Sequence, residues 1–338
     1  MTQRVVLAVD GGNSKTYVAL LGGDGELLSL VRGPLSSPHH IGVDGCLALL
    51  EELFERAVAD AGLTDAQLPV AEVAAILLAG VDFPSEEEHL QELVDARGWA
   101  SRAFVENDTF AVLRAGTEEG WGVAVVCGAG INCVGVAPDG RHARFPALGA
   151  ITGDWGGGRD VGLAAVFAAA RSEDGRGPKT SLERLVPGHF GLRTPKELAE
   201  AMHRKLIPER RVLELPPLVF AEAAEDPVAA SIVDRLADEI VALARATLER
   251  LELVQEPVEV LLGGGLLQRG DGRLLDAIEQ GLRDVGPRIE VRSTGSPNIV
   301  GSALLALDEL GAGREAQRRA RAELGAAVDR IERSATGG

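Results

Sequence analysis

The stretch that decides the fold is RVVLAVDGGNSKT, at residues 4–16. Its apolar run predicts a buried strand that ends at Asp10, after which Gly11 and Gly12 allow a tight turn. Residues 16–22 and 26–31 predict two further strands, separated by an Asp-Gly turn. The chain is therefore predicted to open with a three-stranded meander whose first turn is rich in glycine.

The same arrangement returns at residues 121–145. WGVAVVC leads into Gly128-Ala129-Gly130, a strand is predicted at 132–137, and RHARF follows a Pro-Asp-Gly turn. Repetition of a whole supersecondary unit is rarer by chance than a short motif. We therefore predict two related domains that face each other across a cleft, with two unrelated hairpins as the alternative.

The rest of the chain alternates helical and strand patterns, which is typical of α/β proteins. The predicted helices are 43–61, 86–97, 160–171, 195–206, 228–254 and 297–312, and the predicted strands are 72–79, 103–105 and 258–262. Clusters of proline and glycine predict loops at 174–178 and 208–217. We place an N-terminal domain at 1–116, completed by the helix at about 297–312, a C-terminal domain at 117–296, and a peripheral tail at 313–338.

Composition excludes several classes of partner. The 338 residues carry 34 lysines and arginines against 51 aspartates and glutamates, a net charge of −17. Nucleic acids and membrane surfaces both require clustered positive charge, so neither is an expected partner. The three cysteines form no CxxC pair and predict neither a zinc site nor a disulfide framework. With no signal-peptide pattern and no long apolar run, we expect a soluble, cytoplasmic protein.

Three glycine loops, each directly after an apolar strand, predict a nucleotide site. Glycine lets backbone N–H groups approach a phosphate closely, and hydroxyl or ammonium groups beside it add donors. Asp10 could hold Mg²⁺ through water. A run of glycines after VEVLL offers a flat platform for an adenine ring. The predicted nucleotide-binding residues are Gly11, Gly12, Asn13, Ser14, Lys15, Thr16, Gly128, Ala129, Gly130, Gly263, Gly264 and Gly265.

The segments DGGNSKT, CGAGINC and LLGGG resemble the two phosphate motifs and the adenosine motif of the actin, heat-shock chaperone and sugar-kinase superfamily. Within it, the chain is most similar, from Val5 to about Leu307, to N-acetylglucosamine kinases and the BadF/BadG-type ATPases. The resemblance implies two actin-like (ribonuclease H-like) α/β domains, each a mixed five-stranded sheet flanked by helices, with the nucleotide in the interdomain cleft. It also implies a homodimer that uses ATP and Mg²⁺ to phosphorylate a hexose or amino sugar, foremost N-acetylglucosamine or glucosamine at the 6-hydroxyl.

The resemblance also suggests residues for the acceptor site. Asp108, in VENDTFAV, is similar to the catalytic aspartate that takes the proton of the sugar hydroxyl; its alternative role is to cap the helix predicted at 109–115. Asn107 beside it is a sugar-binding candidate. Asp154, in GDWGGG, resembles an aspartate that contacts the sugar in a GDEGS segment. His39 lies in a stretch similar to a sugar-binding one, and an ordinary loop histidine is the alternative.

Departures from the family pattern concern the acceptor more than the nucleotide. Trp155 replaces the glutamate of GDEGS, and GAGIN lacks two hydroxyls of GTGSN. Asn132 and the backbone donors remain, so Asn132 is kept as a substrate-binding candidate. Two other functions stay open: an ATPase that drives electron transfer, which would need cysteines for an iron–sulfur cluster, and a non-catalytic sugar- or nucleotide-binding regulator.

Overall fold

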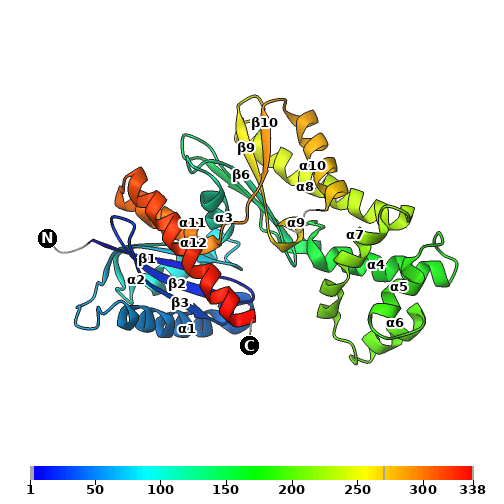
Figure 1. Ribbon diagram of the computed structural model, residues 1–338, viewed down its shortest axis with the longest axis horizontal. Coiled ribbons are helices and arrows are strands. Elements are labelled where there is room, and N and C mark those ends of the chain that lie inside the picture. The colour runs from blue at the N-terminus through cyan, green and yellow to red at the C-terminus, as the bar shows by residue number, and fades with distance from the viewer. Residues whose placement is uncertain (1–3, 269–270, 337–338) are drawn as a thin grey trace. The chain divides into compact units, whose positions relative to one another are not determined.

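The computed structural model describes residues 4–268 and 271–336, and the chain forms two compact units (Figure 1). The first unit comprises Met1–Trp121 and Thr294–Gly338, and the second comprises Gly122–Ser293. The elements of the first unit are β1 (Val5–Gly11), β2 (Thr16–Gly22), β3 (Leu27–Gly33), α1 (Pro38–Asp60), β4 (Ala71–Leu78), α2 (Pro84–Asp95), β5 (Ala100–Asn107), α3 (Thr109–Gly116), α11 (Asn298–Leu310) and α12 (Arg314–Thr336).

The sheet of the first unit has the strand order β3-β2-β1-β4-β5. Strands β1, β2 and β3 pair antiparallel, whereas β1, β4 and β5 run parallel to one another. Strand β1 is central and its apolar run is buried almost throughout, as expected for a strand covered on both faces. The carboxyl ends of the three parallel strands meet at one edge, which brings Gly11, Leu78 and Asn107 into line.

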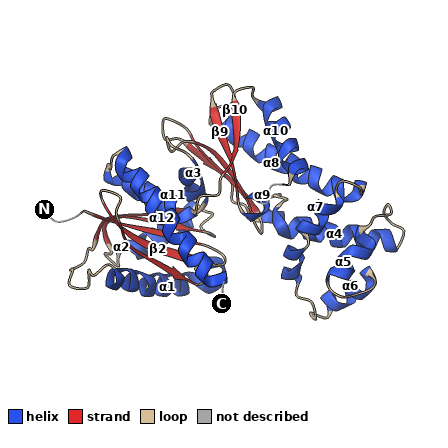
Figure 2. Cartoon of the chain, viewed as in Figure 1, coloured by secondary structure: helices blue, strands red, loops and turns tan. Residues whose placement is uncertain are grey.

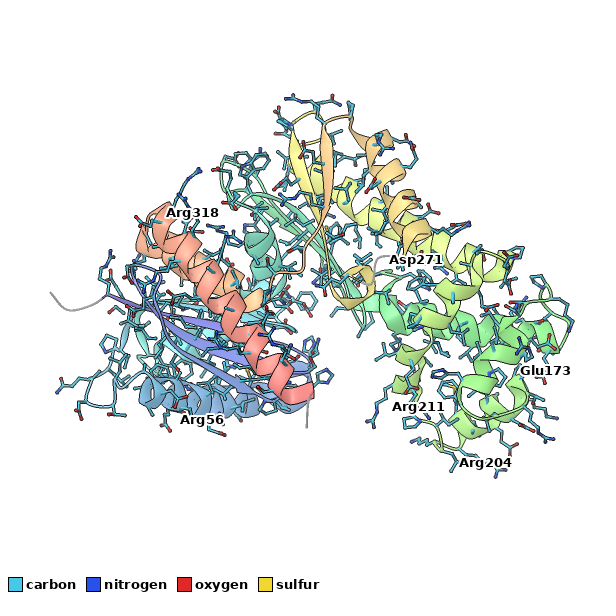
Figure 3. The ribbon with its side chains drawn as sticks, viewed as in Figure 1. Arg56, Glu173, Arg204, Arg211, Asp271 and Arg318 are labelled. Atoms are coloured by element: carbon cyan, nitrogen blue, oxygen red, sulfur yellow. The ribbon has the colours of Figure 1, made fainter. Side chains whose placement is uncertain are left out.

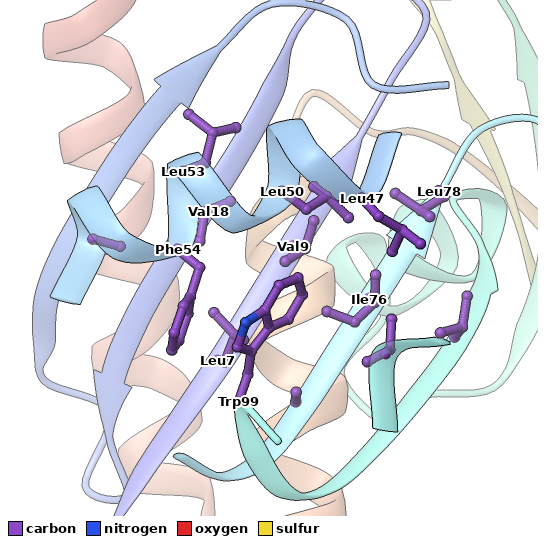
Figure 4. Packing of buried hydrophobic residues seen from close by; sticks show 14 of the residues in the cluster. Leu7, Val9, Val18, Leu47, Leu50, Leu53, Phe54, Ile76, Leu78 and Trp99 are labelled. Atoms are coloured by element: carbon purple, nitrogen blue, oxygen red, sulfur yellow. The ribbon is translucent and has the colours of Figure 1, made fainter. Parts of the chain in front are cut away.

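One face of this sheet packs against α1 and α2 (Figures 1 and 4). Leu7 and Val9 of β1 point toward Leu50 and Phe54 of α1, and the ring of Phe54 stacks on Trp99 at a centroid distance of 5.2 Å. Full burial of side chains of this size stabilises a fold by about 1.5–3 kcal/mol each. This core therefore holds β1, and the turn that follows it, in place.

The opposite face is covered by α3, α11 and α12. Helices α3 and α11 lie so close that a Cβ on Gly301 would stand 1.8 Å from the carbonyl oxygen of Ala111. The buried Arg114 of α3 pairs with Asp308 of α11 at 2.6 Å (Nε to Oδ2). The C-terminal segment is therefore part of the first unit, and residues 294–338 complete it.

The second unit repeats the topology of the first. Its sheet has the order β10-β9-β6-β7-β8, with β6, β7 and β8 antiparallel and β6, β9 and β10 parallel. Two mixed five-stranded sheets of equal strand order, each flanked by helices, confirm the predicted fold (Figure 2). The elements of the second unit are β6 (Gly122–Cys127), β7 (Ile131–Val136), β8 (His142–Arg144), η1 (Gly149–Ile151), α4 (Gly157–Glu173), α5 (Leu182–His189), α6 (Pro195–His203), η2 (Glu209–Glu214), α7 (Pro216–Glu222), α8 (Pro227–Arg250), β9 (Val258–Gly263), α9 (Gly265–Gln268), α10 (Gly272–Val285) and β10 (Ile289–Ser293).

Local signals explain where the helices of the second unit begin. Helix α8 starts with a proline, and the carboxylate of Asp226 accepts from the N–H of Val228 at 2.8 Å, a standard cap. The predicted loop at 208–217 is wrong in part, because it contains η2 and the first turn of α7. Proline fits the first turn of a helix as well as a loop.

Charged side chains lie on the outside of both units, as labelled Arg56, Arg204 and Arg318 illustrate (Figure 3). Within residues 4–268 and 271–336, no helix combines the length and apolar character needed to cross a membrane.

Candidate functional site

The parallel edge of the first sheet is held by backbone hydrogen bonds between neighbouring strand ends. The N–H of Ala79, after β4, donates to Gly11 O at 2.7 Å, and the N–H of Asp108, after β5, donates to Leu78 O at 3.3 Å. The N–H of Ser36 donates to Gly12 O at 3.2 Å. The glycine turn, the segment after β4 and Asp108 are therefore fixed relative to one another.

Asp108 stands at the junction of β5 and α3, and its side chain makes no capping hydrogen bond to the helix. Asn107 takes that role, because its Oδ1 accepts from the N–H of Thr109 at 3.0 Å and from its hydroxyl at 2.6 Å. Although Asp108 keeps partial exposure, burial, and then the charge of Asp82, raise the pKa of its carboxyl to about 7. Asp108 occupies the N-cap position of α3, but the capping hydrogen bond is made by Asn107, and backbone N–H groups of Asp108 and Thr109 only partly offset the raised pKa of the Asp108 carboxyl.

Asp10 lies close enough to Asp108 for the charge of Asp108 to affect the pKa of its carboxyl. Burial, and then the charge of Asp108, raise the pKa of Asp10 to about 7, against opposing effects from Lys15 and a hydrogen bond with Asn298 of α11. Asp10, Asp82 and Asp108 thus concentrate negative charge at one edge, where a divalent cation or a polarised hydroxyl would relieve the repulsion. Among the described residues no group of three or more His, Cys, Asp or Glu forms a ready metal cage. A cation held through water by one carboxylate, as predicted for Asp10, fits this donor set.

His39 and Asn107 both lie at this edge of the first sheet, but they differ in exposure and in their contacts. His39 Nε2 is 3.7 Å from Glu86 Oε1 and 4.0 Å from Asp82 Oδ2, and its side chain is 44% exposed. Asn107 is buried, and its Nδ2 donates to Val81 O at 3.1 Å and to Asp82 Oδ1 at 3.0 Å. His39 is therefore open to a ligand, while Asn107 orients Asp82 and Thr109.

Sequence reasoning missed Asp82 and Glu86. Asp108 directly follows β5, whereas Asp82 lies four residues after the end of β4 at Leu78, so position after a strand alone did not single it out. Glu86 accepts from the N–H groups of Asp82 and Phe83 at 2.8 and 3.0 Å, and so it holds the loop at the start of α2.

The turn between β1 and β2 is closed by a hydrogen bond from the N–H of Gly12 to Lys15 O, at 3.0 Å. Asn13 and Ser14 are exposed at its tip. The hydroxyl of the buried Thr16 donates to Pro34 O at 2.7 Å, and the ammonium of Lys15 lies 2.6 Å from Glu332 Oε1. The donors left open on this turn are therefore backbone N–H groups and the two exposed side chains.

The second glycine turn is bound by the start of α4. The N–H groups of Gly158 and Arg159 donate to the carbonyls of Gly128 and Ala129 at 2.8 and 3.0 Å. Gly157 has φ +75°, and a Cβ there would stand 2.5 Å from the backbone of Gly130. The glycines of GDWGGG thus allow this segment to lie directly against the turn, whose residues Ala129 and Gly130 are exposed.

The third glycine segment lies beside the second within the same unit, because β9 runs parallel to β6. Gly263 is buried at the end of β9, Gly264 has φ +90°, and the exposed Gly265 begins α9. A Cβ on Gly264 would stand 2.5 Å from the carbonyl oxygen of Cys127. Close packing between strands therefore requires Gly264, while Gly265 presents open backbone.

A pocket of about 430 Å³ adjoins the second turn, lined in part by Gly130, Asp154, Trp155, Arg159 and Arg235. The guanidinium of Arg235 lies over the Trp155 ring, 4.0 Å from its centroid. Asp154 accepts a hydrogen bond from the hydroxyl of Thr152. Arg159 and Arg235 were not predicted, since arginines on helices α4 and α8 gave no signal distinct from solvated charge.

Asn132 differs from Asp154 in its setting. It lies in β7, and its Oδ1 accepts from the N–H of Cys133 at 2.7 Å. It is not among the residues that line this pocket.

The chain is similar to known proteins over most of its length. At 27% identity over 310 residues, the chain is similar to the N-acetylmuramic acid/N-acetylglucosamine kinase of Clostridium acetobutylicum, covering 90% of this chain and 99% of that protein. It is 26% identical over 317 residues to the N-acetyl-D-glucosamine kinase of Dictyostelium discoideum, covering 91% and 99%. A structure from Chromobacterium violaceum, assigned as an N-acetylglucosamine kinase, has 25% identity and a TM-score of 0.68 over 90% of this chain and 100% of its own.

A second structure, from Porphyromonas gingivalis and also assigned as an N-acetylglucosamine kinase, supports the fold alone at 19% identity and a TM-score of 0.61, covering 90% of this chain and 98% of its own. The predicted resemblance is confirmed, as is the prediction of a kinase, which agrees with both curated relatives. The family model that matches residues 7–306 is that of the BadF/BadG/BcrA/BcrD ATPases, and the chain belongs to the BadF/BadG/BcrA/BcrD ATPase family.

Proposed function

We propose that this protein transfers the γ-phosphate of ATP to the 6-hydroxyl of an amino sugar, with N-acetylglucosamine as the first candidate and glucosamine and N-acetylmuramic acid next. The observation that carries the proposal is the acidic edge of the first sheet, where the Asp108 side chain makes no capping hydrogen bond and its pKa is raised to about 7. A carboxyl with that pKa suits a general base at neutral pH. The curated relatives, which are named for N-acetylglucosamine and N-acetylmuramic acid, support the acceptor class.

In the proposed reaction, Asp108 orients the acceptor hydroxyl and accepts its proton. The hydroxyl oxygen forms a bond to the γ-phosphorus while the bond from that phosphorus to the bridging oxygen breaks, which releases ADP. Asp10 would hold Mg²⁺ through water, and the ion would supply charge neutralisation on the phosphates. His39, beside Asp82, is proposed to contact the sugar, whereas Asn107 is proposed to hold Asp82 in place.

The two glycine turns are proposed to bind phosphate oxygens through backbone N–H groups. Within the first turn the proposal rests on Gly11, Gly12, Asn13 and Ser14, because the side chains of Lys15 and Thr16 are engaged elsewhere. Within the second unit it rests on Gly128, Ala129 and Gly130, and Gly265 offers backbone for the adenine. Asp154 and the pocket beside it are proposed to bind part of the acceptor. A homodimer and a cytoplasmic location stay predictions.

One assay separates the kinase from an ATPase. Purified protein with Mg-ATP is incubated with N-acetylglucosamine, glucosamine, N-acetylmuramic acid, glucose or no sugar, and ADP release is followed together with ³¹P spectra of the products. We expect ADP release that depends on an amino sugar, with the phosphate on the 6-oxygen, and none with the 6-deoxy analogue. Equal ADP release with and without every sugar would contradict the proposal and favour the ATPase. The three cysteines are free and buried, which argues against an iron–sulfur cluster in that role.

A further inference from the structure

Helix α12 contacts Lys15 in the glycine turn between β1 and β2, called the phosphate turn below. The helix lies outside the family match, which ends at residue 306. It packs through Ala320 and Leu324, both fully buried. The chain is adapted to its presence, because Gly25 in the β2–β3 turn has φ +85° and a Cβ there would stand 2.0 Å from the carbonyl oxygen of Ala316. The helix is therefore a built part of the first unit.

Polar contacts attach α12 to the first unit at two places, the β2–β3 turn and the end of α3. Glu323 accepts from the N–H of Leu27 at 2.8 Å, and Arg319 pairs with Asp24 at 2.7 Å. Arg321 donates to the carbonyls of Arg114 and Ala115, at the end of the helix that follows Asp108. The helix thus connects the β2–β3 turn to the last turn of α3.

The last turns of α12 bring Glu332 to the base of the glycine turn. Its carboxylate lies 2.6 Å from Lys15 Nζ and 3.7 Å from Arg32 Nε, and it accepts a hydrogen bond from the hydroxyl of Tyr17. Lys15 Nζ also lies 5.3 Å from the centre of the Tyr17 ring. Tyr17 is itself buried and is the register partner of Asp10 on β1. One carboxylate therefore holds both residues that flank Thr16, at the point where the turn enters β2.

Charge balance makes Glu332 compatible with phosphate binding. Lys15, Arg32 and Glu332 together keep one net positive charge, so the carboxylate does not make the turn anionic. Because Lys15 and Glu332 are 39% and 37% exposed, we expect their ion pair to contribute little to global stability and its loss to leave the fold intact. The contact restricts the conformational freedom of residues 12–15, so the turn loses less conformational entropy when a ligand binds.

We propose that Glu332 is a positioning residue for the phosphate turn: through Lys15 and Tyr17, α12 preorganises residues 12–15 for the phosphates of ATP. The inference rests on the proposed function of that turn. It assigns Lys15 to the support of the turn rather than to direct phosphate contact. It also gives the segment after residue 306 a role in the reaction.

The test compares Glu332→Ala with two matched variants. Glu332→Gln keeps an acceptor oxygen for Tyr17 and Lys15, and Asp329→Asn removes one charge from an exposed position one helical turn earlier. We expect Glu332→Ala to raise the KM for ATP about fivefold, which corresponds to about 1 kcal/mol, with kcat within about twofold and the KM for the sugar unchanged. Glu332→Gln should recover most of the loss, and Asp329→Asn should match the wild type.

Calorimetric titration with a non-hydrolysable ATP analogue provides a readout independent of activity, and far-UV circular dichroism checks the fold. If the wild type does not bind the analogue, the proposed function fails and the inference fails with it. If the wild type binds and Glu332→Ala binds equally well, the inference alone is overturned, and Glu332 is only structural. Tighter binding by Glu332→Ala would also overturn it, because the carboxylate would then be screening Lys15 from the phosphates.

Discussion

The two glycine turns share one architecture and differ in what surrounds them. Each lies between the first two strands of a sheet with the same order and the same strand directions. The turn after β1 adjoins Asp10 and Asp108, whose pKa values are both raised to about 7, whereas the turn after β6 consists of Gly128, Ala129 and Gly130 beneath α4. A duplicated scaffold thus carries two carboxyls of raised pKa beside one turn, whereas the pocket beside the other turn is lined in part by Asp154 and Arg159.

The largest expected effect on this contrast comes from removing the carboxyl of Asp108, which lies beside the first turn. We expect Asp108→Asn to lower kcat by about 10³-fold, within the range for loss of a general base, with the KM for ATP within about threefold. The same variant should raise Tm at pH 8, because ionised Asp108 is buried near Asp82 and costs stability there. Kinetics and thermal melts check both parts, with Asp60→Asn, exposed at the end of α1, as the control. Activity close to that of the wild type would disprove the assignment.

The contrast also predicts how activity depends on pH. A carboxyl whose folded-state pKa is raised holds its proton up to about pH 7, so the base form is lost as pH falls through that value. We expect kcat/KM to drop about tenfold per unit below pH 7, with apparent pKa values that belong to the coupled Asp10–Asp108 pair. The same titration predicts that stability decreases from about pH 4 to pH 7, since the folded state binds the proton more tightly than the unfolded chain. A rate profile that stays flat down to pH 5 would contradict this reading.

Much of the contrast was predictable from the sequence, because period-two strands, glycine turns and Asp-Gly turns are local signals. The sequence correctly put Asp108 directly after a strand, while its assignment as the catalytic residue came from the family resemblance and stays a proposal. Local signals could not show that Thr16 donates to Pro34 or that Lys15 pairs with Glu332, since those partners are separated by 18 and 317 residues. Asp82 was missed for a related reason: its importance comes from the parallel pairing of β4 with β5, which the sequence does not display.

A smaller effect on the KM for ATP is expected from a change in α4 where it packs against the second glycine turn. Gly157→Ala introduces a Cβ that would stand 2.5 Å from Gly130 at a residue with φ +75°, so the turn or α4 must shift. We expect the KM for ATP to rise about tenfold, with a loss of about 2–4 kcal/mol in the free energy of unfolding.

The matched control is Gly175→Ala, where φ is +80° and a Cβ would meet nothing within 4 Å. It should cost about 1 kcal/mol and leave the KM for ATP unchanged. Denaturant titration and steady-state kinetics on both variants give the comparison. If both variants change the KM alike, the second turn has no special part in binding ATP.

The smallest effect tests whether side chains of the first turn bind phosphate. The hydroxyl of Thr16 is fully buried and donates to Pro34 O, so it is unavailable to a ligand. Thr16→Val conserves shape but leaves that carbonyl without its donor, which should cost about 1–3 kcal/mol in the free energy of unfolding, with the KM for ATP within about threefold. Thr16→Ser keeps the hydroxyl and should retain most of the stability. A rise of more than about tenfold in the KM of Thr16→Val, with Thr16→Ser near the wild type, would mean that the hydroxyl exchanges Pro34 for a phosphate oxygen when ATP binds, and the first turn would then use side chains where the second uses only backbone.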